Sequence, residues 1–191
     1  YISYRLFASD YHPVFVDTGA KYAALDYAAA QALVPNLQYL KMPTLTEHYS
    51  GMVPHRNLIL LALVANKFDC CEIMVSAPKG ELVSDQQPAL YRKVSKLVGI
   101  TVSNPAGRYT KSGLIRQALA RGVTATELLQ TRSCYSDSTV PCGECSACIK
   151  RAIAFGNSNL ALGWTYQRTG VAKLLSQMSL RLILRHGFSA T

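Results

Sequence analysis

Four of the chain's six cysteines lie in one short segment, at Cys134, Cys142, Cys145 and Cys148. Two C-x2-C turns share Cys145, and turns of this kind bring thiolates to about 2.3 Å from a single zinc ion. Cys134, from the preceding loop, completes a closed tetrahedral set. Four thiolates leave no position open for water or substrate, so we predict a structural zinc site.

An iron–sulfur cluster is the alternative occupant, because C-x2-C-x2-C spacing also occurs in ferredoxins. The ferredoxin pattern continues with a fourth cysteine followed by proline. Here Ile149, Lys150 and Arg151 follow Cys148 instead. A colourless purified protein would favour zinc.

Stretches typical of strands alternate with stretches typical of helices along the chain. The predicted strands cover residues 12–17, 37–42, 71–77 and 100–110, the last of which runs into a loop. The predicted helices cover residues 1–8, 22–34, 56–68, 88–98, 111–122 and 125–130, and the helix 56–68 is apolar enough to be buried. This alternation requires crossover connections, so we predict an α/β fold whose doubly wound parallel sheet is covered on both faces.

We divide the chain into an α/β domain, residues 1–130, and a zinc-binding segment with C-terminal helices, residues 131–191. Residues 167–187 are predicted to form a basic helix with an apolar stripe. The chain begins with Tyr1, inside a predicted helix that lacks an N-cap residue. A doubly wound sheet normally starts with a strand that leads into a ligand loop, so we expect the natural N-terminus to lie further back.

Composition and charge restrict the function further. The 191 residues are 49% apolar, which is enough for a sizeable core. No apolar run reaches the length of a membrane span, and no secretory signal pattern is present, so we expect a soluble, cytoplasmic protein. The net charge of +9 favours an anionic partner. Because the basic residues are scattered, we expect a solvated surface with a phosphate pocket and no disordered basic arm.

The segment from Ser133 to Arg151 resembles the zinc signature of the 7-cyano-7-deazaguanine synthases, which are PP-loop ATP pyrophosphatases. That signature is Ser-Cys-Tyr, then Cys-Gly-x-Cys-x-x-Cys, with an arginine three residues further on, as in this chain. Three upstream stretches, "FVDTGAKY", "VPHRN" and "YTKSGLI", also resemble family segments. The resemblance covers about residues 1–155. It implies a PP-loop fold, similar to the adenine nucleotide α hydrolases, with a C-terminal zinc segment.

The sequence departs from the family pattern at three places. The Ser-Gly-Gly-x-Asp-Ser phosphate loop is absent, and the family places it just before the helix that "YISYRLF" resembles. In the family's Tyr-Pro-Asp-x-Arg segment, only the acidic position has a match here, Asp85 in "LVSDQQPALYRK". Ala20 and Lys21 stand where Gln and Arg are usual.

The resemblance and the residue types together predict the site residues. We expect Arg56 and Lys111 to stabilise phosphate or carboxylate charge, because guanidinium and ammonium groups bind such anions. Asp85 is predicted to hold magnesium or to orient the base, and it completes the predicted catalytic set. The predicted nucleotide-binding residues are Asp17, Gly19, Arg56, Asn57 and Lys111. Each residue also has a purely structural alternative. Arg56 and Lys111 could be ordinary surface charges. Residues 17–19 could form a plain turn, and Asn57 could be a simple N-cap.

The resemblance implies a reaction, its cofactors and its partners. ATP adenylates 7-carboxy-7-deazaguanine, ammonia displaces AMP to give the amide, and a second ATP activates the amide so that loss of AMP leaves the nitrile. The implied cofactors are structural zinc, ATP and magnesium. The implied partners are the small-molecule substrate and ammonia, with a homodimer expected and no direct nucleic-acid contact.

Two other functions remain open from the sequence. A relative with the same fold could adenylate a different carboxylate, since most of the Tyr-Pro-Asp-x-Arg segment is missing. A nucleic-acid-binding module held together by zinc would also explain the positive charge and the four cysteines. However, no basic face interleaved with aromatic residues is visible in the sequence.

Overall fold

The computed structural model describes residues 1–47, 53–80 and 87–162, in which helices and short strands alternate as predicted. The strands are β1 (Val14–Asp17), β2 (Gln38–Lys41), β3 (Glu72–Met74) and β4 (Thr101–Ser103). The helices are α1 (Ile2–Phe7), α2 (Ala23–Leu33), α3 (Arg56–Lys67), α4 (Pro88–Val98), α5 (Lys111–Ala120), α6 (Ala125–Gln130) and α7 (Ser146–Gly156), with a 3-10 turn, η2, at Pro105–Arg108. Asp85 and the predicted helix 167–187 lie outside the described residues.

The strands pair in parallel, which confirms the predicted α/β class. Val14 of β1 lies opposite Gln38 of β2, and Glu72 of β3 lies opposite Thr101 of β4. A helix crosses between the strands of each pair, α2 in the first and α4 in the second. The strands form two separate pairs, and no strand within the described ranges joins them.

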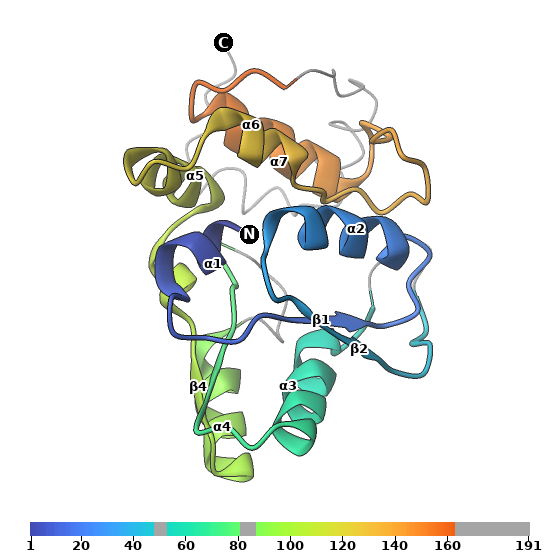
Figure 1. The fold of residues 1–191 in the computed structure, drawn as a ribbon, viewed down its shortest axis with the longest axis vertical. Coiled ribbons are helices and arrows are strands. Elements are labelled where there is room, and N and C mark those ends of the chain that lie inside the picture. The colour runs from blue at the N-terminus through green and yellow to red at the C-terminus, as the bar shows by residue number, and fades with distance from the viewer. Residues whose placement is uncertain (48–52, 81–86, 163–191) are drawn as a thin grey trace, which may run out of the picture.

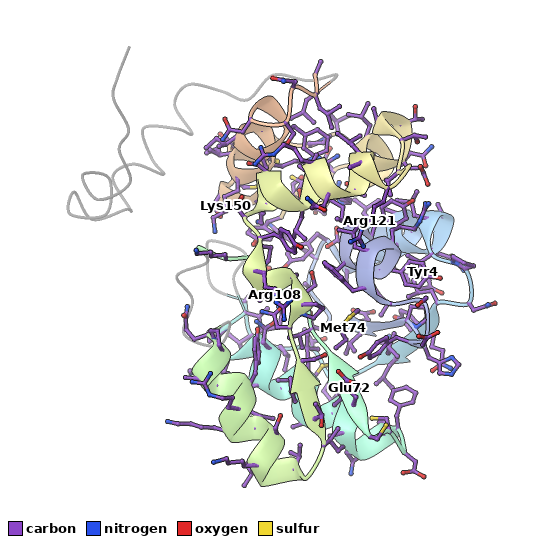
Figure 2. The ribbon with its side chains drawn as sticks, turned by 90° about the vertical axis from the view of Figure 1, so that its left-hand side faces the viewer. Tyr4, Glu72, Met74, Arg108, Arg121 and Lys150 are labelled. Atoms are coloured by element: carbon purple, nitrogen blue, oxygen red, sulfur yellow. The ribbon has the colours of Figure 1, made fainter. Side chains whose placement is uncertain are left out.

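The elements form an elongated arrangement in which helices α5, α6 and α7 gather at one end (Figure 1). Helices α3 and α4 with strand β4 occupy the other end, and α1, α2, β1 and β2 lie between them. Figure 2 shows Arg121 near α1, where its Nη1 donates to the carbonyl of Leu6 at 3.1 Å. This hydrogen bond connects α1 to the helices α5, α6 and α7.

The two largest apolar cores lie one at each end of the molecule, and a smaller cluster contains Ala20, Tyr22 and Ala23. The larger core packs α1 against α5, α6 and α7, with Leu6, Leu114, Leu128 and Phe155 among its buried side chains. The second of the two cores includes Leu61 of α3 and buried residues of β3 and α4. Because Phe155 packs among residues that precede position 130, α7 rests on the α/β part of the chain. The division into domains at residue 130 stays a prediction.

Local capping interactions begin two of the helices. Thr124 begins α6 with a capping box, in which its hydroxyl accepts from the backbone N–H of Glu127 while the Glu127 carboxylate accepts from that of Thr124. Thr110 caps α5 by accepting from the backbone N–H of Gly113. The prediction that α3 is a buried helix is wrong. Only Leu61 of this helix is buried, because α3 packs with one face against β3 and α4.

None of the described helices is long and apolar enough to cross a membrane.

Candidate metal centre and active site

The four predicted cysteine ligands come together in space. Their Sγ atoms all lie within 4.8 Å of one another, with Cys134 and Cys142 at 3.5 Å and Cys142 and Cys148 at 4.0 Å. Four sulfurs around a tetrahedral zinc ion, each bonded at about 2.3 Å, are about 3.8 Å apart. The cluster is therefore compatible with a zinc site, as the spacing of the cysteines predicts.

The backbone around the cysteines is folded to support thiolates. Gly143 has a φ of 75°, which lets the chain turn tightly between Cys142 and Cys145. Backbone N–H groups point at the sulfurs: that of Cys145 donates to Cys142 Sγ, and that of Cys148 to Cys145 Sγ, each at 3.4 Å. Cys145 is also the N-cap residue of α7, so this helix begins within the cluster.

Electrostatics at the cluster favour a bound cation. Burial alone would raise the pKa of the Cys134 thiol, but hydrogen bonds from the Ser136 hydroxyl and from the backbone N–H groups of Cys142 and Ser136 lower it to about 6. Burial raises the pKa of Cys148 well above its ordinary value. Four clustered sulfurs cannot all be thiolates without a positive charge among them, and a divalent metal ion supplies that charge.

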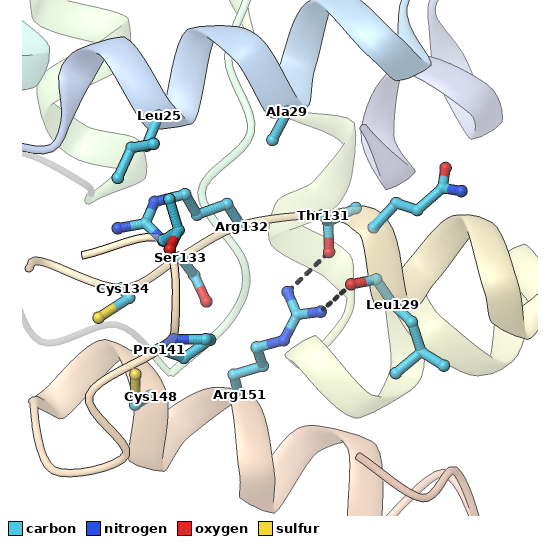
Figure 3. A pocket seen from close by; sticks show the side chains of 12 residues that line it. Leu25, Ala29, Leu129, Thr131, Arg132, Ser133, Cys134, Pro141, Cys148 and Arg151 are labelled. Atoms are coloured by element: carbon cyan, nitrogen blue, oxygen red, sulfur yellow. Dashed lines mark hydrogen bonds between the residues drawn. The ribbon is translucent and has the colours of Figure 1, made fainter. Parts of the chain in front are cut away.

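Arg151, the arginine of the predicted zinc signature, binds α6 (Figure 3). Its Nη1 donates to Thr131 Oγ1 at 2.7 Å, and its Nη2 donates to the carbonyls of Leu128 and Leu129 at 3.0 and 3.2 Å. The guanidinium also lies over the ring of Phe155, 4.6 Å from its centroid. Arg151 therefore satisfies carbonyls at the C-terminus of α6 and fixes α7, together with the cysteines that precede it, against that helix.

A cavity of about 430 Å³ lies beside the cysteine cluster. Its walls come from the start of α1, the first residues of α3 and α5, the segment 131–135 and helix α7. The cationic residues that line it are Arg56, Lys111, Arg132, Lys150 and Arg151. None of the described acidic residues lines it, so the cavity suits an anion.

The structure thus brings together two of the predicted catalytic residues. Arg56 is the first residue of α3 and Lys111 the first residue of α5. Both positions place the side chain at the N-terminus of a helix, which is the positive end of the helix dipole. Asn57 follows Arg56 as the second residue of α3 and is not among the residues that line the cavity.

Asp17 and Gly19 lie elsewhere and form a local turn at the end of β1. The carboxylate of Asp17 accepts from the backbone N–H of Gly19 at 2.8 Å and from the hydroxyl of Tyr39. Gly19 has a φ of 72°, and a Cβ at this position would lie 2.4 Å from Thr44 Oγ1. Neither residue lines the 430 Å³ cavity, and their predicted contact with nucleotide stays a prediction.

The sequence prediction did not place Arg132, Ser133 and Tyr135, which follow α6, in the wall of a cavity, and all three line it. Arg132 Nε lies 3.2 Å from Asp26 Oδ1 on α2, and its Nη2 donates to the carbonyl of Ser136. The ring of Tyr135 packs against that of Tyr22, with centroids 5.3 Å apart. Ser133 and Tyr135 belong to the zinc signature, and Arg132 precedes it, so their position next to the predicted ligand Cys134 was the sequence signal.

Together, the paired parallel strands, the crossover helices and the four-cysteine centre define an α/β protein of the PP-loop class. The family model for the queuosine biosynthesis protein QueC matches residues 20–159, well over half of the chain, and the chain belongs to this family.

Individual relatives agree with this assignment. A 7-cyano-7-deazaguanine synthase from Persephonella marina is 31% identical over 147 residues, which are 69% of this chain and 61% of the relative. The synthase from Alteromonas mediterranea is 30% identical over 54% of this chain and 51% of the relative. The synthase from Methanosarcina barkeri is 29% identical over 56% of this chain and 50% of the relative. The chain therefore spans between about half and three-fifths of the length of these relatives.

Proposed function

We propose that the protein is an ATP-dependent 7-cyano-7-deazaguanine synthase, which converts 7-carboxy-7-deazaguanine and ammonia to 7-cyano-7-deazaguanine through adenylated intermediates. One observation carries the proposal beyond family membership. The cationic first residues of α3 and α5, Arg56 and Lys111, line the same cavity beside the four-cysteine cluster, and no acidic side chain from the described ranges lines it.

The chemistry explains why such a cavity is needed. A carboxylate is a poor electrophile, and ATP supplies the activation by turning one of its oxygens into part of a leaving group. The protein must then hold two anions, a carboxylate and a triphosphate, close together against their mutual repulsion. Arg56 supplies a rigid fork of donors and Lys111 a compact charge, and both lie where helix dipoles also favour anions. We assign them to offset the charge on the substrates.

Zinc, in this proposal, has a structural role. When bound, it would supply four bonds that cross-link the segment after α6, which carries Cys134, to the start of α7. Cys134, Cys142, Cys145 and Cys148 would hold it as thiolates. Magnesium would accompany ATP, and Asp85, which lies outside the described residues, remains our proposed residue for it.

The cavity also bears on the alternatives. The cationic side chains Arg56, Lys111 and Lys150 line a concave space, and this arrangement supports a small anionic ligand over a nucleic-acid strand, which would need an exposed basic face. The experiment below also distinguishes a different carboxylate substrate, because only Asp85 matches the family's Tyr-Pro-Asp-x-Arg segment.

The test is to incubate the full-length protein with ATP, ammonium and 7-carboxy-7-deazaguanine and to look for the nitrile by mass spectrometry. We expect the nitrile and AMP to form together, with the amide as an intermediate. If AMP forms only when another carboxylate replaces 7-carboxy-7-deazaguanine, the substrate is wrong and the activation chemistry stands. If no carboxylate promotes release of AMP, the proposed function is wrong.

A further inference from the structure

Tyr135 lines the 430 Å³ cavity from the segment that follows Cys134. Its ring packs against the ring of Tyr22, with centroids 5.3 Å apart and planes inclined by 33°. Tyr22 is the N-cap residue of α2 and is only 6% exposed. The Tyr135 ring therefore has a fixed aromatic support that does not itself line the cavity.

Two further anchors hold the backbone of this segment. Asp26 follows Tyr22 by four positions on α2, so both side chains lie on the same face of that helix. Arg132 lies against Asp26, as Tyr135 lies against Tyr22. Between them, Cys134 Sγ accepts from the backbone N–H groups of Ser136 and Cys142 at 3.4 and 3.3 Å. The segment is thus held by α2 on one side and by the cysteine cluster on the other.

Two other aromatic residues, Tyr1 and Phe155, also line the cavity. The guanidinium of Arg151 covers the Phe155 ring, which is 4% exposed. The Tyr1 hydroxyl donates to Glu127 and accepts from Arg5, whose guanidinium also lies 5.7 Å from the centre of the Tyr1 ring. Tyr135 is partly exposed and lines the same cavity. A flat, anchored aromatic face in a cationic cavity suits a planar heterocycle that carries negative charge.

We propose that the ring of Tyr135 stacks on the planar heterocycle of the substrate, which makes Tyr135 a specificity-determining residue. This inference rests on the proposed function, since the heterocycle is the deazaguanine ring of that reaction. It also gives the cysteine cluster a link to substrate binding. A metal bound by Cys134 fixes the backbone next to the stacking ring.

The experiment compares Tyr135→Leu with Tyr135→Phe in the full-length protein. Leucine keeps the apolar bulk but has no π face, and phenylalanine keeps the π face but has no hydroxyl. Stacking of a base on an aromatic side chain predicts a Kd for 7-carboxy-7-deazaguanine about 5- to 100-fold higher in Tyr135→Leu, by isothermal titration calorimetry. We expect Tyr135→Phe to bind within about 3-fold of the unmodified protein.

Two controls separate stacking from a general loss of structure. Tyr11→Leu makes the same change at a tyrosine that does not line the cavity, and it should leave the Kd unchanged. Zinc content and the thermal midpoint of each variant show whether the fold is intact. If Tyr135→Leu loses zinc, Tyr135→Trp decides the question, because its indole emission should change when the heterocycle stacks on it. Unchanged emission during binding would overturn the inference.

The remaining outcomes distinguish this inference from the proposed function. If the unmodified protein binds the heterocycle and Tyr135→Leu binds it equally well, Tyr135 does not stack and the proposed function stands. Equal weakening by Tyr135→Leu and Tyr11→Leu also overturns the inference, because the effect is then not local. If the unmodified protein does not bind 7-carboxy-7-deazaguanine, the proposed function and the inference fall together.

Discussion

Arg132 lies against Asp26, with its Nε 3.2 Å from Asp26 Oδ1, and this ion pair joins the metal-binding segment to α2. The Arg132 side chain is only 10% exposed, and neither Nε nor Oδ1 has a hydrogen-bond partner of good geometry within the described part of the chain. Burial raises the pKa of Asp26 to about 6, although the charges of Arg132 and Arg56 act in the opposite direction. Loss of hydration therefore outweighs the attraction of the two cations.

The first prediction concerns the pH dependence of stability. Because the folded pKa of Asp26, about 6, exceeds its ordinary value of 3.8, the folded protein binds this proton more tightly than the unfolded chain. The contribution of Asp26 to the free energy of unfolding is then greatest below pH 4 and falls as the pH rises to 6, by up to about 3 kcal/mol. Asp26→Asn removes this pH-dependent contribution to the free energy of unfolding. Urea unfolding of both proteins from pH 3.5 to 7.5 should show the difference between them changing in this window. Parallel stability curves would contradict the prediction.

The second prediction concerns Arg151, whose guanidinium satisfies Thr131 Oγ1 and two carbonyls at the end of α6. Arg151→Lys keeps the charge but cannot reach all three acceptors, so we expect the free energy of unfolding to fall by about 1–3 kcal/mol. Arg116→Lys is the matched control, because Arg116 donates to a single exposed acceptor, the carbonyl of Asn157. The control should change stability by less than about 0.5 kcal/mol. Similar losses in the two variants would show that Arg151 has no special structural role.

Much of the fold follows from local patterns that the sequence displays directly. Helix α5 begins at the Thr-Lys pair and α6 at a Ser/Thr-x-x-Glu pattern, because capping depends on residues only three positions apart. The C-x2-C spacing likewise predicts the cysteine cluster, since each turn is local. Parallel pairing follows from the alternation of strands and helices.

Contacts between distant parts of the chain could not be predicted in this way. Asp26 appears isolated in the sequence because its partner, Arg132, lies on another element far along the chain. The same holds for Tyr22 and Tyr135. The apolar composition of α3 suggested burial on all sides, but the packing of neighbouring elements decides burial, and among the described elements α3 packs mainly against β3 and α4. The carbonyl acceptors of Arg151 likewise depend on how α6 and α7 pack.

The third prediction tests the metal. We expect one zinc ion per chain, held by the four thiolates, and Cys145→Ser should abolish stoichiometric zinc. The thermal midpoint should then fall by about 10 °C or more, because metal binding contributes directly to folding. Cys71→Ser is the control, since Cys71 is exposed and lies outside the cluster. Zinc is measured by elemental analysis of protein dialysed against a weak chelator. Retention of a full zinc equivalent by Cys145→Ser, or a brown iron-containing protein, would rule out this site.

The fourth prediction tests the two cations at the helix N-termini. Lys111→Met and Arg56→Lys should each lower kcat/KM for nitrile formation by about 100-fold, because each removes a donor preorganised toward developing negative charge. The thermal midpoint should change little. Lys93→Met is the control, as Lys93 is exposed on α4 and does not line the cavity. Rates come from the formation of AMP under saturating ammonium. If Lys111→Met keeps the unmodified rate, Lys111 is an ordinary surface charge.

The fifth prediction compares two glycines with the same backbone conformation. Gly19 and Gly99 both have a φ of 72°, so alanine at either position costs about 1–2 kcal/mol of backbone strain. A Cβ at Gly99 meets nothing within 4 Å, whereas at Gly19 it would lie 2.4 Å from Thr44 Oγ1 and 2.7 Å from Thr44 Cα. The backbone of residue 44 cannot move aside as a side chain could, so Gly19→Ala should lose about 1–3 kcal/mol more than Gly99→Ala. Chemical unfolding of both variants measures this difference. Equal losses would mean that the turn after β1 yields to the added methyl group, and that Gly19 is required only for its φ.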